Sequence, residues 1–487
     1  MPYQIENASP GFDFHGKITS MSASDLDAST MNQFRHSGVE SHSTILLGAG
    51  ASITSGLPSW NDFARKLLVS SGAVNESSAE LLLKHQEPMI AVESARAADE
   101  STWEQRLSDA LYEGVKDLEV LEPSPLHLAT VGHYLESRSN RSILTLNFDV
   151  LIEQTLLMET QEVAESVTRS YDMDHKNAVF HLHGVITPDK TENVILTLND
   201  FTKLIEDKDS WQSGLLSAAV SKGALIIAGT SYRDPDLRQW LYSALKYKPR
   251  NHKAFVLLAR ESFKVSKEEF SNLKRALSSQ WRAVGLHPVF MHDHTDAAQI
   301  IRELTFVNDA DYVSPKERCR LIWEAHERNF GKLQPYYVEQ LSLDAEDLKE
   351  CFNVETLDVT LWLSNGDGRL VRWASQDREY RTVDALRVVE TGHDSPWIAG
   401  QAFAAESRIV EDLSSHPTRR WKSVVALPVV VEHPKFPIVS SAVLTVGLPN
   451  TADSYESKAE TWGSTLAAIA VEWSERLFES VYSGLDA

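Results

Sequence analysis

Cysteine is almost absent from this chain, which has two cysteines among 487 residues. Cys319 and Cys351 lie far apart in the sequence and fit neither a disulfide framework nor a zinc site. We interpret both as reduced structural cysteines, which are typical of a cytosolic protein. We therefore expect no metal site in this protein.

Basic clusters and long apolar runs are also missing. No run of Lys or Arg exceeds two residues and the formal net charge is −22, which disfavours direct contact with nucleic acid or anionic membrane. No apolar stretch approaches the roughly 20 residues that cross a bilayer. The first sixteen residues lack the apolar core of a secretory signal. We expect a cytoplasmic protein.

The remaining composition is that of a globular protein, with 42% hydrophobic and 24% charged residues. Residues 1–41 are polar without a clear period and are interpreted as an N-terminal arm. From residue 42 to residue 308, short apolar runs alternate with amphipathic segments, which predicts an α/β fold with a doubly wound parallel sheet. The expected buried strands are 44–47, 142–146, 179–182, 194–196, 224–228, 254–258 and 288–291.

The pattern changes after residue 308. A charged helical stretch over 315–330 predicts a connector, which we place at residues 309–340. Residues 341–487 carry runs typical of a mixed sheet and end in a helical pattern, which predicts a second domain of α+β type. The expected elements are strands at 357–363, 369–373, 423–431 and 441–446, and a helix at 456–477.

A glycine-rich turn follows the first predicted strand. It is Gly48-Ala49-Gly50-Ala51-Ser52, and Gly56-Leu57-Pro58-Ser59-Trp60 then leads into an amphipathic helix. Glycines at such a turn let backbone amides approach a pyrophosphate. A tight turn that needs glycine for its dihedral angles would look the same, so both interpretations stay open.

Two polar residues, Asn147 and Asp149, follow the strand predicted at 142–146. Ligands of doubly wound sheets bind at the carboxyl ends of the strands, so these side chains are candidate site residues. If they share one face, Phe148 points to the core. The alternative is an Asx turn in which Asp149 caps the next helix.

Histidines occur at the end of the strand predicted at 179–182, in the segment Phe180-His181-Leu182-His183-Gly184. A histidine changes protonation near neutral pH and suits general-base catalysis. We interpret His181 as structural. His183 is the candidate base, because a glycine that leaves room beside it follows and because it lies among the other motifs.

The strand predicted at 224–228 ends in Gly229-Thr230-Ser231, and Asp234-Pro235-Asp236 follows. Ser231 could bond a ribose or a phosphate. Either aspartate could instead be an N-cap or a first-turn acid at a helix start.

In this order and spacing, the four motifs resemble the sirtuin superfamily, and specifically its bacterial sirtuin-like branch. The resemblance covers about residues 43–304 and implies a Rossmann-type domain that binds NAD as its substrate. It implies catalytic roles for His183, Asn147 and Asp149. The NAD contacts that it implies are Gly48, Ala49, Gly50, Ser52, Pro58, Trp60, Gly229, Thr230, Ser231 and Asp234.

The chain departs from deacylating sirtuins in two ways. It lacks their four-cysteine zinc module, and Ser59-Trp60-Asn61 replaces the acid–Phe–Arg sequence of their opening loop. The branch without the module is associated with antiphage defence and hydrolyses NAD. The resemblance therefore implies a base role for His183, and ribose or water positioning by Asn147 and Asp149.

The order of segments over about residues 341–477 resembles a GAF domain. These segments are a glycine-opened helix near Gly400, the stretch 408–413, a Val-rich strand at 423–431 and a Val-Leu-Thr strand at 443–445. The resemblance implies a sensor or assembly domain that binds a small molecule, such as a cyclic nucleotide, or a protein activator, and that forms homo-oligomers. The tryptophans that could line a ligand pocket, or simply belong to the core, are Trp362, Trp373, Trp397 and Trp421.

The leading hypothesis is an NAD glycohydrolase that produces nicotinamide and ADP-ribose, acts in antiphage defence by abortive infection, and is controlled by the C-terminal domain. A protein deacylase or ADP-ribosyltransferase is the first alternative, and the missing zinc cysteines count against it. A non-catalytic nucleotide sensor is the second, and the joint presence of Asn147, Asp149 and His183 argues against it.

Overall fold

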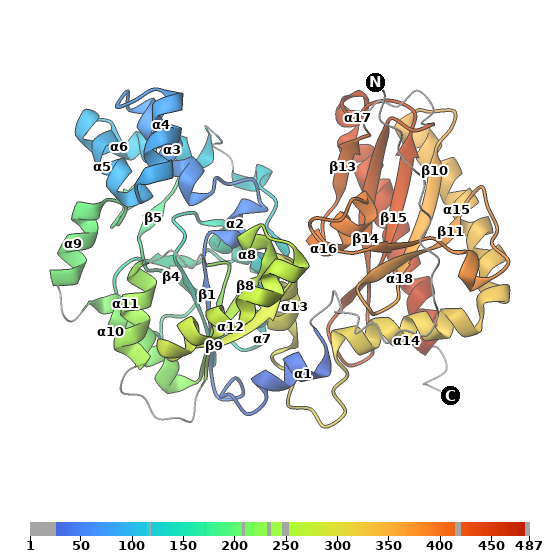
Figure 1. The fold of residues 1–487 in the computed structure, drawn as a ribbon, viewed down its shortest axis with the longest axis horizontal. Coiled ribbons are helices and arrows are strands. Elements are labelled where there is room, and N and C mark those ends of the chain that lie inside the picture. The colour runs from blue at the N-terminus through green and yellow to red at the C-terminus, as the bar shows by residue number, and fades with distance from the viewer. Residues whose placement is uncertain are drawn as a thin grey trace, which may run out of the picture.

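A computed structural model describes residues 26–113, 115, 118–170, 172–206, 210–230, 235–245, 253–413 and 420–482. The chain forms two units that lie side by side, the first around a parallel sheet and the second around an antiparallel sheet (Figure 1). Among the described residues, no helix combines the length and the apolar character needed to span a bilayer.

The first unit contains a seven-stranded sheet in the order β3-β4-β2-β1-β7-β8-β9, and each neighbouring pair of strands is parallel. All residues of the central strands β1 and β7 are buried, which explains their unbroken apolar sequences. The strands are β1 (Ser43–Leu47), β2 (Arg141–Thr145), β3 (Glu165–Val167), β4 (Ala178–His181), β7 (Ala224–Ala228), β8 (Ala254–Ala259) and β9 (His287–Met291).

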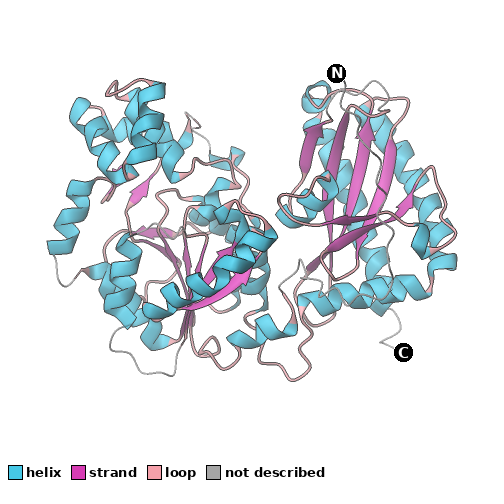
Figure 2. Ribbon diagram, in the orientation of Figure 1, coloured by secondary structure: helices cyan, strands magenta, loops and turns pink. Residues whose placement is uncertain are grey.

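Helices cover both faces of this sheet (Figure 2). One face packs on α1 (Ala28–Met31), α2 (Gly50–Ile53), α7 (Pro125–Glu136), α8 (Leu151–Thr160) and α13 (His294–Glu303). The other face packs on α10 (Trp211–Lys222), α11 (Pro235–Leu245) and α12 (Lys267–Ala283). The unit is therefore doubly wound, as the alternation of apolar runs predicts.

A helical bundle lies between β1 and β2 in the chain and has its own apolar core. This core also includes Ile186 and Leu196, and Phe148 packs against it, so the bundle borders the ends of β2 and β4. The bundle helices are α3 (Trp60–Ser70), α4 (Glu76–His85), α5 (Pro88–Ala98) and α6 (Trp103–Tyr112), and nearby elements are α9 (Leu198–Glu206), β5 (Val185–Ile186) and β6 (Thr191–Glu192).

The second unit contains a six-stranded antiparallel sheet in the order β12-β11-β10-β15-β14-β13. Its larger core lies under α14 (Pro315–Arg328), α15 (Phe330–Phe352) and α18 (Ala459–Tyr482), and α16 (Ile398–Ala405) covers the opposite face. The remaining elements are β10 (Asp358–Ser364), β11 (Arg369–Ser375), β12 (Val388–Glu390), β13 (Ile409–Asp412), β14 (Ser423–Val431), β15 (Val439–Leu448) and α17 (Asp453–Glu456).

The predicted fold class is confirmed, and three details are wrong. The C-terminal sheet is antiparallel throughout its described pairings and not mixed. The short strands β3, β5, β6 and β12 were not predicted. Residues 194–196 form no strand, because Ile195 N donates to the carbonyl oxygen of His183 (2.9 Å) and Leu196 packs into the bundle core.

The predicted division of the chain into an arm, two domains and a connector stays a proposal, and two observations bear on it. Leu26, Met31 and Phe34 of the proposed arm are buried in the core of the first unit. Helix α15 runs without interruption through the proposed limit at residue 340 and packs on the second sheet.

Candidate functional site

The four predicted motifs lie at one edge of the parallel sheet. β1 ends at Leu47, β2 at Thr145, β4 at His181 and β7 at Ala228, and each motif follows its strand end directly. Because the strands are parallel, their carboxyl ends meet at this edge, where ligands of doubly wound sheets bind. The candidate site is this carboxyl edge, with the helical bundle beside it.

The glycine turn after β1 packs directly against the end of β7. Gly50 N donates to the carbonyl oxygen of Gly229 (2.8 Å). A Cβ atom added at Gly48 would stand 2.8 Å from that oxygen, and one at Gly50 would stand 2.9 Å from it. Gly229 itself has a φ of +68°. The close approach of two chain segments therefore requires these glycines, and this satisfies the turn interpretation without excluding a phosphate beside it.

Asn147 and Asp149 are both buried after β2, and Phe148 between them is half-buried against the bundle. Asn147 Nδ2 donates to Ser52 Oγ (2.9 Å), whereas its Oδ1 is buried with no hydrogen-bond partner among the described residues. Buried amide oxygens are normally satisfied, so this atom needs a ligand or a water molecule as a partner.

Asp149 accepts a hydrogen bond from Leu151 N (3.2 Å), which is the Asx turn expected as an alternative. Burial raises the pKa of Asp149, although hydrogen bonds from Ser52 and Leu151 N oppose this shift. The Asp149 side chain therefore stabilises the turn that leads into α8, and it also lies at the candidate site.

A relay of hydrogen bonds holds Asn147. Ser124 N donates to His127 Nδ1 (3.2 Å), so the ring proton is on Nε2, which lies 3.4 Å from Ser52 Oγ. Burial lowers the pKa of His127 to about 4, which keeps the ring neutral. Ser52, predicted as an NAD contact, is buried and faces Asn147 and Asp149. It can therefore orient both side chains.

His183 follows β4, and its Nδ1 lies 3.2 Å from the carbonyl oxygen of Leu146. A carbonyl oxygen only accepts, so Nδ1 carries the proton and Nε2 holds the lone pair of the neutral ring. Gly184 has a φ of +84°, and a Cβ there would stand 2.3 Å from Asn193 O, so this position requires glycine. The tautomer is the one that a general base acting through Nε2 needs.

His181 is fully buried, with its Nε2 2.7 Å from Glu153 Oε1 and its Nδ1 3.1 Å from the carbonyl oxygen of Asn147. Burial would lower the pKa of His181, but the Glu153 carboxylate and the other hydrogen bonds raise it overall. This residue fixes the backbone of the Asn147 segment, as expected for a structural histidine.

The other predicted contacts occupy different parts of the edge. Ala49 is exposed in the glycine turn, and Thr230 Oγ1 is buried there with no partner among the described residues. Pro58 and Trp60 lie half-buried where α3 begins. Ser231 and Asp234 lie outside the described residues.

A row of aromatic rings connects α3 to His183. Ring centroids are 6.0 Å apart for Trp60–Phe63, 6.1 Å for Phe63–Phe148 and 6.3 Å for Phe148–His183. Trp240 of α11 lies 5.2 Å beyond His183. The predicted residues Trp60 and His183 are thus joined through apolar contacts, which limit the access of water to the imidazole.

Two further residues at this edge were not predicted from the sequence. Gln212 on α10 is fully buried, its Nε2 donates to Leu182 O (3.2 Å), and its Oε1 has no partner among the described residues. Trp240 packs on His183. They lie on α10 and α11, which cover the same face of the sheet, and no motif marks them in the sequence.

A separate pocket lies between the two units. Its lining includes Asp293 and Gln299 of the first unit, and Cys319, Thr391 and Glu406 from the part of the chain beyond it. Burial raises the pKa of the Cys319 thiol to about 11, so this cysteine is not a reactive thiolate.

The four tryptophans proposed for a ligand pocket do not line this one. Trp373 is fully buried in the larger core of the second unit, and Trp362 is buried in its smaller core. Arg387 covers Trp397, and Arg420 covers Trp421. The core interpretation is confirmed for Trp362 and Trp373.

The fold first defines the class of the first unit, which is a Rossmann-type α/β domain with its candidate site at the carboxyl ends of its strands. Residues 141–288 match the family model of the SIR2-like domain. This match supports a sirtuin-like domain with an NAD-related function, and its span contains Asn147, Asp149, His183 and Gly229.

A crystal structure of a protein described as a GAF sensor, from Burkholderia vietnamiensis, is similar to part of this chain. The similarity has 16% sequence identity and a TM-score of 0.20, and it covers 34% of this chain and 93% of that chain. No curated protein matches the chain.

Proposed function

We propose that the first unit hydrolyses NAD to nicotinamide and ADP-ribose, with Asn147, Asp149 and His183 as the residues that act on the nicotinamide ribose. The observation that carries the proposal is the buried Asn147 amide, whose Oδ1 lacks a partner while Nδ2 is anchored on Ser52. Such a group is ready to accept a hydrogen bond from a ribose hydroxyl or from the attacking water.

His183 acts as the general base through Nε2, because Nδ1 is held by the carbonyl oxygen of Leu146. Loss of the cationic nicotinamide builds positive charge on the ribose, and removal of a proton from a ribose hydroxyl helps to stabilise that charge. General-base catalysis contributes about 10²- to 10⁴-fold, and positioning by Asn147 and exclusion of water supply the rest.

The diphosphate lies at the glycine turn in this proposal. Gly48 and Gly50 bring the turn against the end of β7, where Ala49 is exposed and the buried Thr230 hydroxyl offers a hydrogen bond. Water is proposed as the acceptor, because the chain lacks the zinc module that accompanies the peptide cleft of deacylating sirtuins.

Control by the C-terminal unit and a role in antiphage defence complete the proposal. The defence role follows from the resemblance to the bacterial sirtuin-like branch. Infected cells that carry the wild-type chain are expected to lose NAD, and cells that carry His183→Ala are expected to keep it.

The direct test is incubation of the purified full chain with NAD, with and without an acyl-lysine peptide, while nicotinamide and ADP-ribose are quantified. His183→Ala should lose turnover, and His85→Ala is the matched control because His85 is exposed at the end of α4. Equal turnover by wild type and His183→Ala contradicts the assignment, and turnover only with the acyl peptide favours a deacylase.

A further inference from the structure

The sheet order determines where the second half of the dinucleotide must lie, and this step rests on the proposed function. The nicotinamide ribose is assigned to the ends of β2 and β4, and the diphosphate to the turn after β1. The order β4-β2-β1-β7-β8-β9 then leads the adenosine half over β7 and β8. Neighbouring strands lie about 4.8 Å apart, so the end of β8 is roughly 10 Å from that of β1.

Arg260 follows the last residue of β8, and a carboxylate of the second unit binds its guanidinium. Its side chain is fully buried, and its two Nη atoms donate to Asp394 Oδ1 (2.6 Å) and Oδ2 (2.8 Å) in a bidentate pair. Its Nε is buried with no partner among the described residues. The Asp394 side chain is 50% exposed whereas that of Arg260 is fully buried, so a ligand would reach the guanidinium in place of Asp394.

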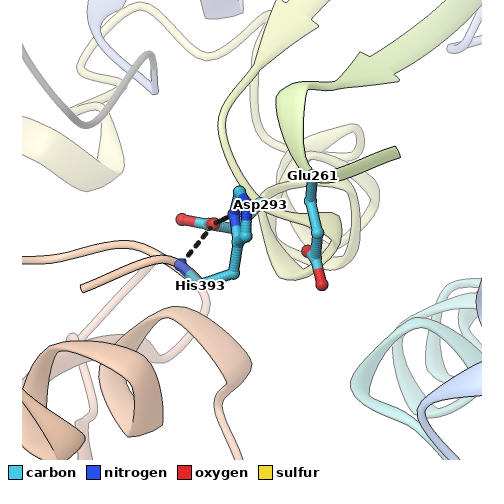
Figure 3. A group of neighbouring side chains, drawn as sticks. All are labelled: Glu261, Asp293 and His393. Atoms are coloured by element: carbon cyan, nitrogen blue, oxygen red, sulfur yellow. Dashed lines mark hydrogen bonds and ion pairs between the residues drawn. The ribbon is translucent and has the colours of Figure 1, made fainter. Parts of the chain in front are cut away.

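Asp293 lies just after β9, and its carboxylate is bound by the residue that precedes Asp394 in the second unit. Its Oδ1 accepts hydrogen bonds from the backbone N of His393 (2.9 Å) and from His393 Nδ1 (2.7 Å). Figure 3 shows this contact with Glu261 beside it. The loop of residues 392–394 therefore binds both Arg260 and Asp293.

Hydrogen bonds within the second unit hold this loop in place. Ser395 N donates to Gly392 O (3.0 Å), and Ser395 Oγ donates to Glu390 O (2.8 Å). Gly392 has a φ of +138°, which favours glycine. The Arg260 and Asp293 contacts therefore form together when the second unit docks.

Glu261, Asp293 and His393 also have donor atoms within 4.8 Å of one another, a spacing that could hold a metal ion. However, His393 Nδ1 is bonded to Asp293 Oδ1 (2.7 Å), and an Nη atom of Arg260 lies 3.5 Å from the same nitrogen. A guanidinium at that distance repels a second cation. The cluster is better explained as a contact between the units.

We propose that Arg260 and Asp293 are contacts for the adenosine half of NAD, and that the loop of residues 392–394 covers them as an autoinhibitory contact. A guanidinium offers five N–H donors for the ribose oxygens and ring nitrogens of a nucleoside, and a carboxylate at a strand end binds ribose hydroxyls. The Asp394 carboxylate therefore takes the place of acceptor atoms of the nucleoside, and the backbone and ring N–H groups of His393 take the place of ribose hydroxyls.

Docking of the loop and binding of the nucleotide then compete. Couplings of this kind change affinities by about 5- to 150-fold, and the effect is reciprocal. A signal that lifts the second unit from this edge would raise the affinity for NAD, and NAD would weaken the docking. This gives the second unit a specific means of control over the site.

The test measures binding of ADP-ribose to the full chain by calorimetry, in wild type, Asp394→Asn and Glu406→Gln. Glu406 is the matched control, because it pairs with Arg302 across the same junction (2.9 Å) near the far end of α13. Arg302 lies about 12 Å along the helix from the sheet edge, at about 1.5 Å per residue. We expect Asp394→Asn to bind at least about 5-fold more tightly and Glu406→Gln to match wild type.

A second comparison tests Arg260 itself. Arg260→Lys in the Asp394→Asn background keeps the charge but loses the bidentate geometry, and it should remove most of the gain. Circular dichroism and the unfolding midpoint establish that each variant is folded.

Three results overturn the inference while leaving the proposed function intact. They are unchanged binding in Asp394→Asn, equal gains in Asp394→Asn and Glu406→Gln, and weaker binding in Asp394→Asn, each found in a chain that hydrolyses NAD. If no variant binds ADP-ribose and none releases nicotinamide, the proposed function fails together with the inference.

Discussion

The buried polar groups at the carboxyl edge of the parallel sheet are mostly neutral, whereas the junction between the units contains buried ion pairs. At the edge, Asn147 Oδ1, Thr230 Oγ1 and Gln212 Oε1 are buried with no partner among the described residues. At the junction, the Nη atoms of Arg260 bind Asp394 and Arg318 binds Glu303, although the Nε atoms of both arginines are also buried with no partner among the described residues. Unsatisfied groups cost folding free energy, and paired groups hold elements together.

The edge therefore has the properties of a candidate binding site, whereas the junction has those of a contact that holds the two units together. The edge retains groups that cost about 1–3 kcal/mol each when nothing binds them, which is typical of a site that awaits a ligand. The charged side chains of the junction form contacts that hold the second unit against the first. Arg260 and Asp293 belong to both regions, because they lie at the same sheet edge and bind the second unit.

Replacement of Asn147 by Ala should give the largest functional effect. We expect nicotinamide release to fall by at least about 100-fold, because the ribose or the water loses its positioning group. The free energy of unfolding should change by less than about 1 kcal/mol, since loss of the bond to Ser52 is offset by removal of the unsatisfied oxygen. Strong destabilisation would show that the edge is structural and would remove the contrast.

Replacement of Arg318 by Met should give the largest effect on stability. Arg318 and Glu303 are both fully buried, and Glu303 also accepts hydrogen bonds from Gln299 (2.6 Å) and Tyr312 (2.8 Å). Removal of one partner from a buried pair costs roughly 3–5 kcal/mol.

The measurement is denaturant unfolding of the Arg318→Met variant and of the double variant Arg318→Met/Glu303→Gln. The double variant should recover part of the loss, because no unpaired charge remains. A loss below about 1 kcal/mol in the single variant would mean that the junction is not held by this pair.

Replacement of Ser52 by Ala should have a smaller effect on activity. Ser52 accepts the Asn147 amide and bonds to Asp149, so its loss loosens both side chains. A lost hydrogen bond of about 1.4 kcal/mol corresponds to roughly a 10-fold fall in kcat. The Kd for ADP-ribose should change less than kcat. An equal fall in both would mean that Ser52 binds the nucleotide directly, as the sequence predicts.

The pH dependence of the junction should give the smallest effect. The hydrogen bond to Asp293 raises the pKa of His393, although burial and the Arg260 cation oppose the shift. Asp293, Glu261 and Arg260 are the charged groups that face it. A raised pKa means that the contact is complete below pH about 6.5 and weakens as the pH rises through the raised value.

Hydrogen exchange at the start of α13 measures this effect. Protection should decrease with rising pH beyond the intrinsic increase of exchange, and His393→Gln should abolish this decrease. The pair of Arg260 with Asp394 does not titrate in the same range, because the Arg260 guanidinium lowers the pKa of Asp394 to about 2. A junction that opens equally in wild type and His393→Gln would exclude the histidine as its pH-sensitive group.

The sequence predicted the parallel sheet because strands such as β1 and β7 are buried on both faces and read as unbroken apolar runs. It also placed Asn147 and His183 at strand ends, where the topology brings them to one edge. Residues 194–196 look like a strand locally, but a backbone bond to His183 and the bundle core decide their conformation.

Other parts of the site could not be predicted from local patterns. Gln212 and Trp240 reach the edge from separate helices, and the Arg260–Asp394 pair joins residues 134 positions apart in the sequence. Such contacts depend on the packing of whole units. The ligand contact of Ser52 stays a prediction, and the bond between its hydroxyl and Asn147 could not be predicted from the sequence because it depends on the folded arrangement.

The most direct test of the central claim is the release of nicotinamide from NAD by the full chain carrying Asp394→Asn, compared with the same chain carrying Asn147→Ala as well. The account predicts stoichiometric nicotinamide and ADP-ribose from the first protein and a rate at least about 100-fold lower from the second. Equal rates from the two proteins, or no release of nicotinamide from the first, would contradict it.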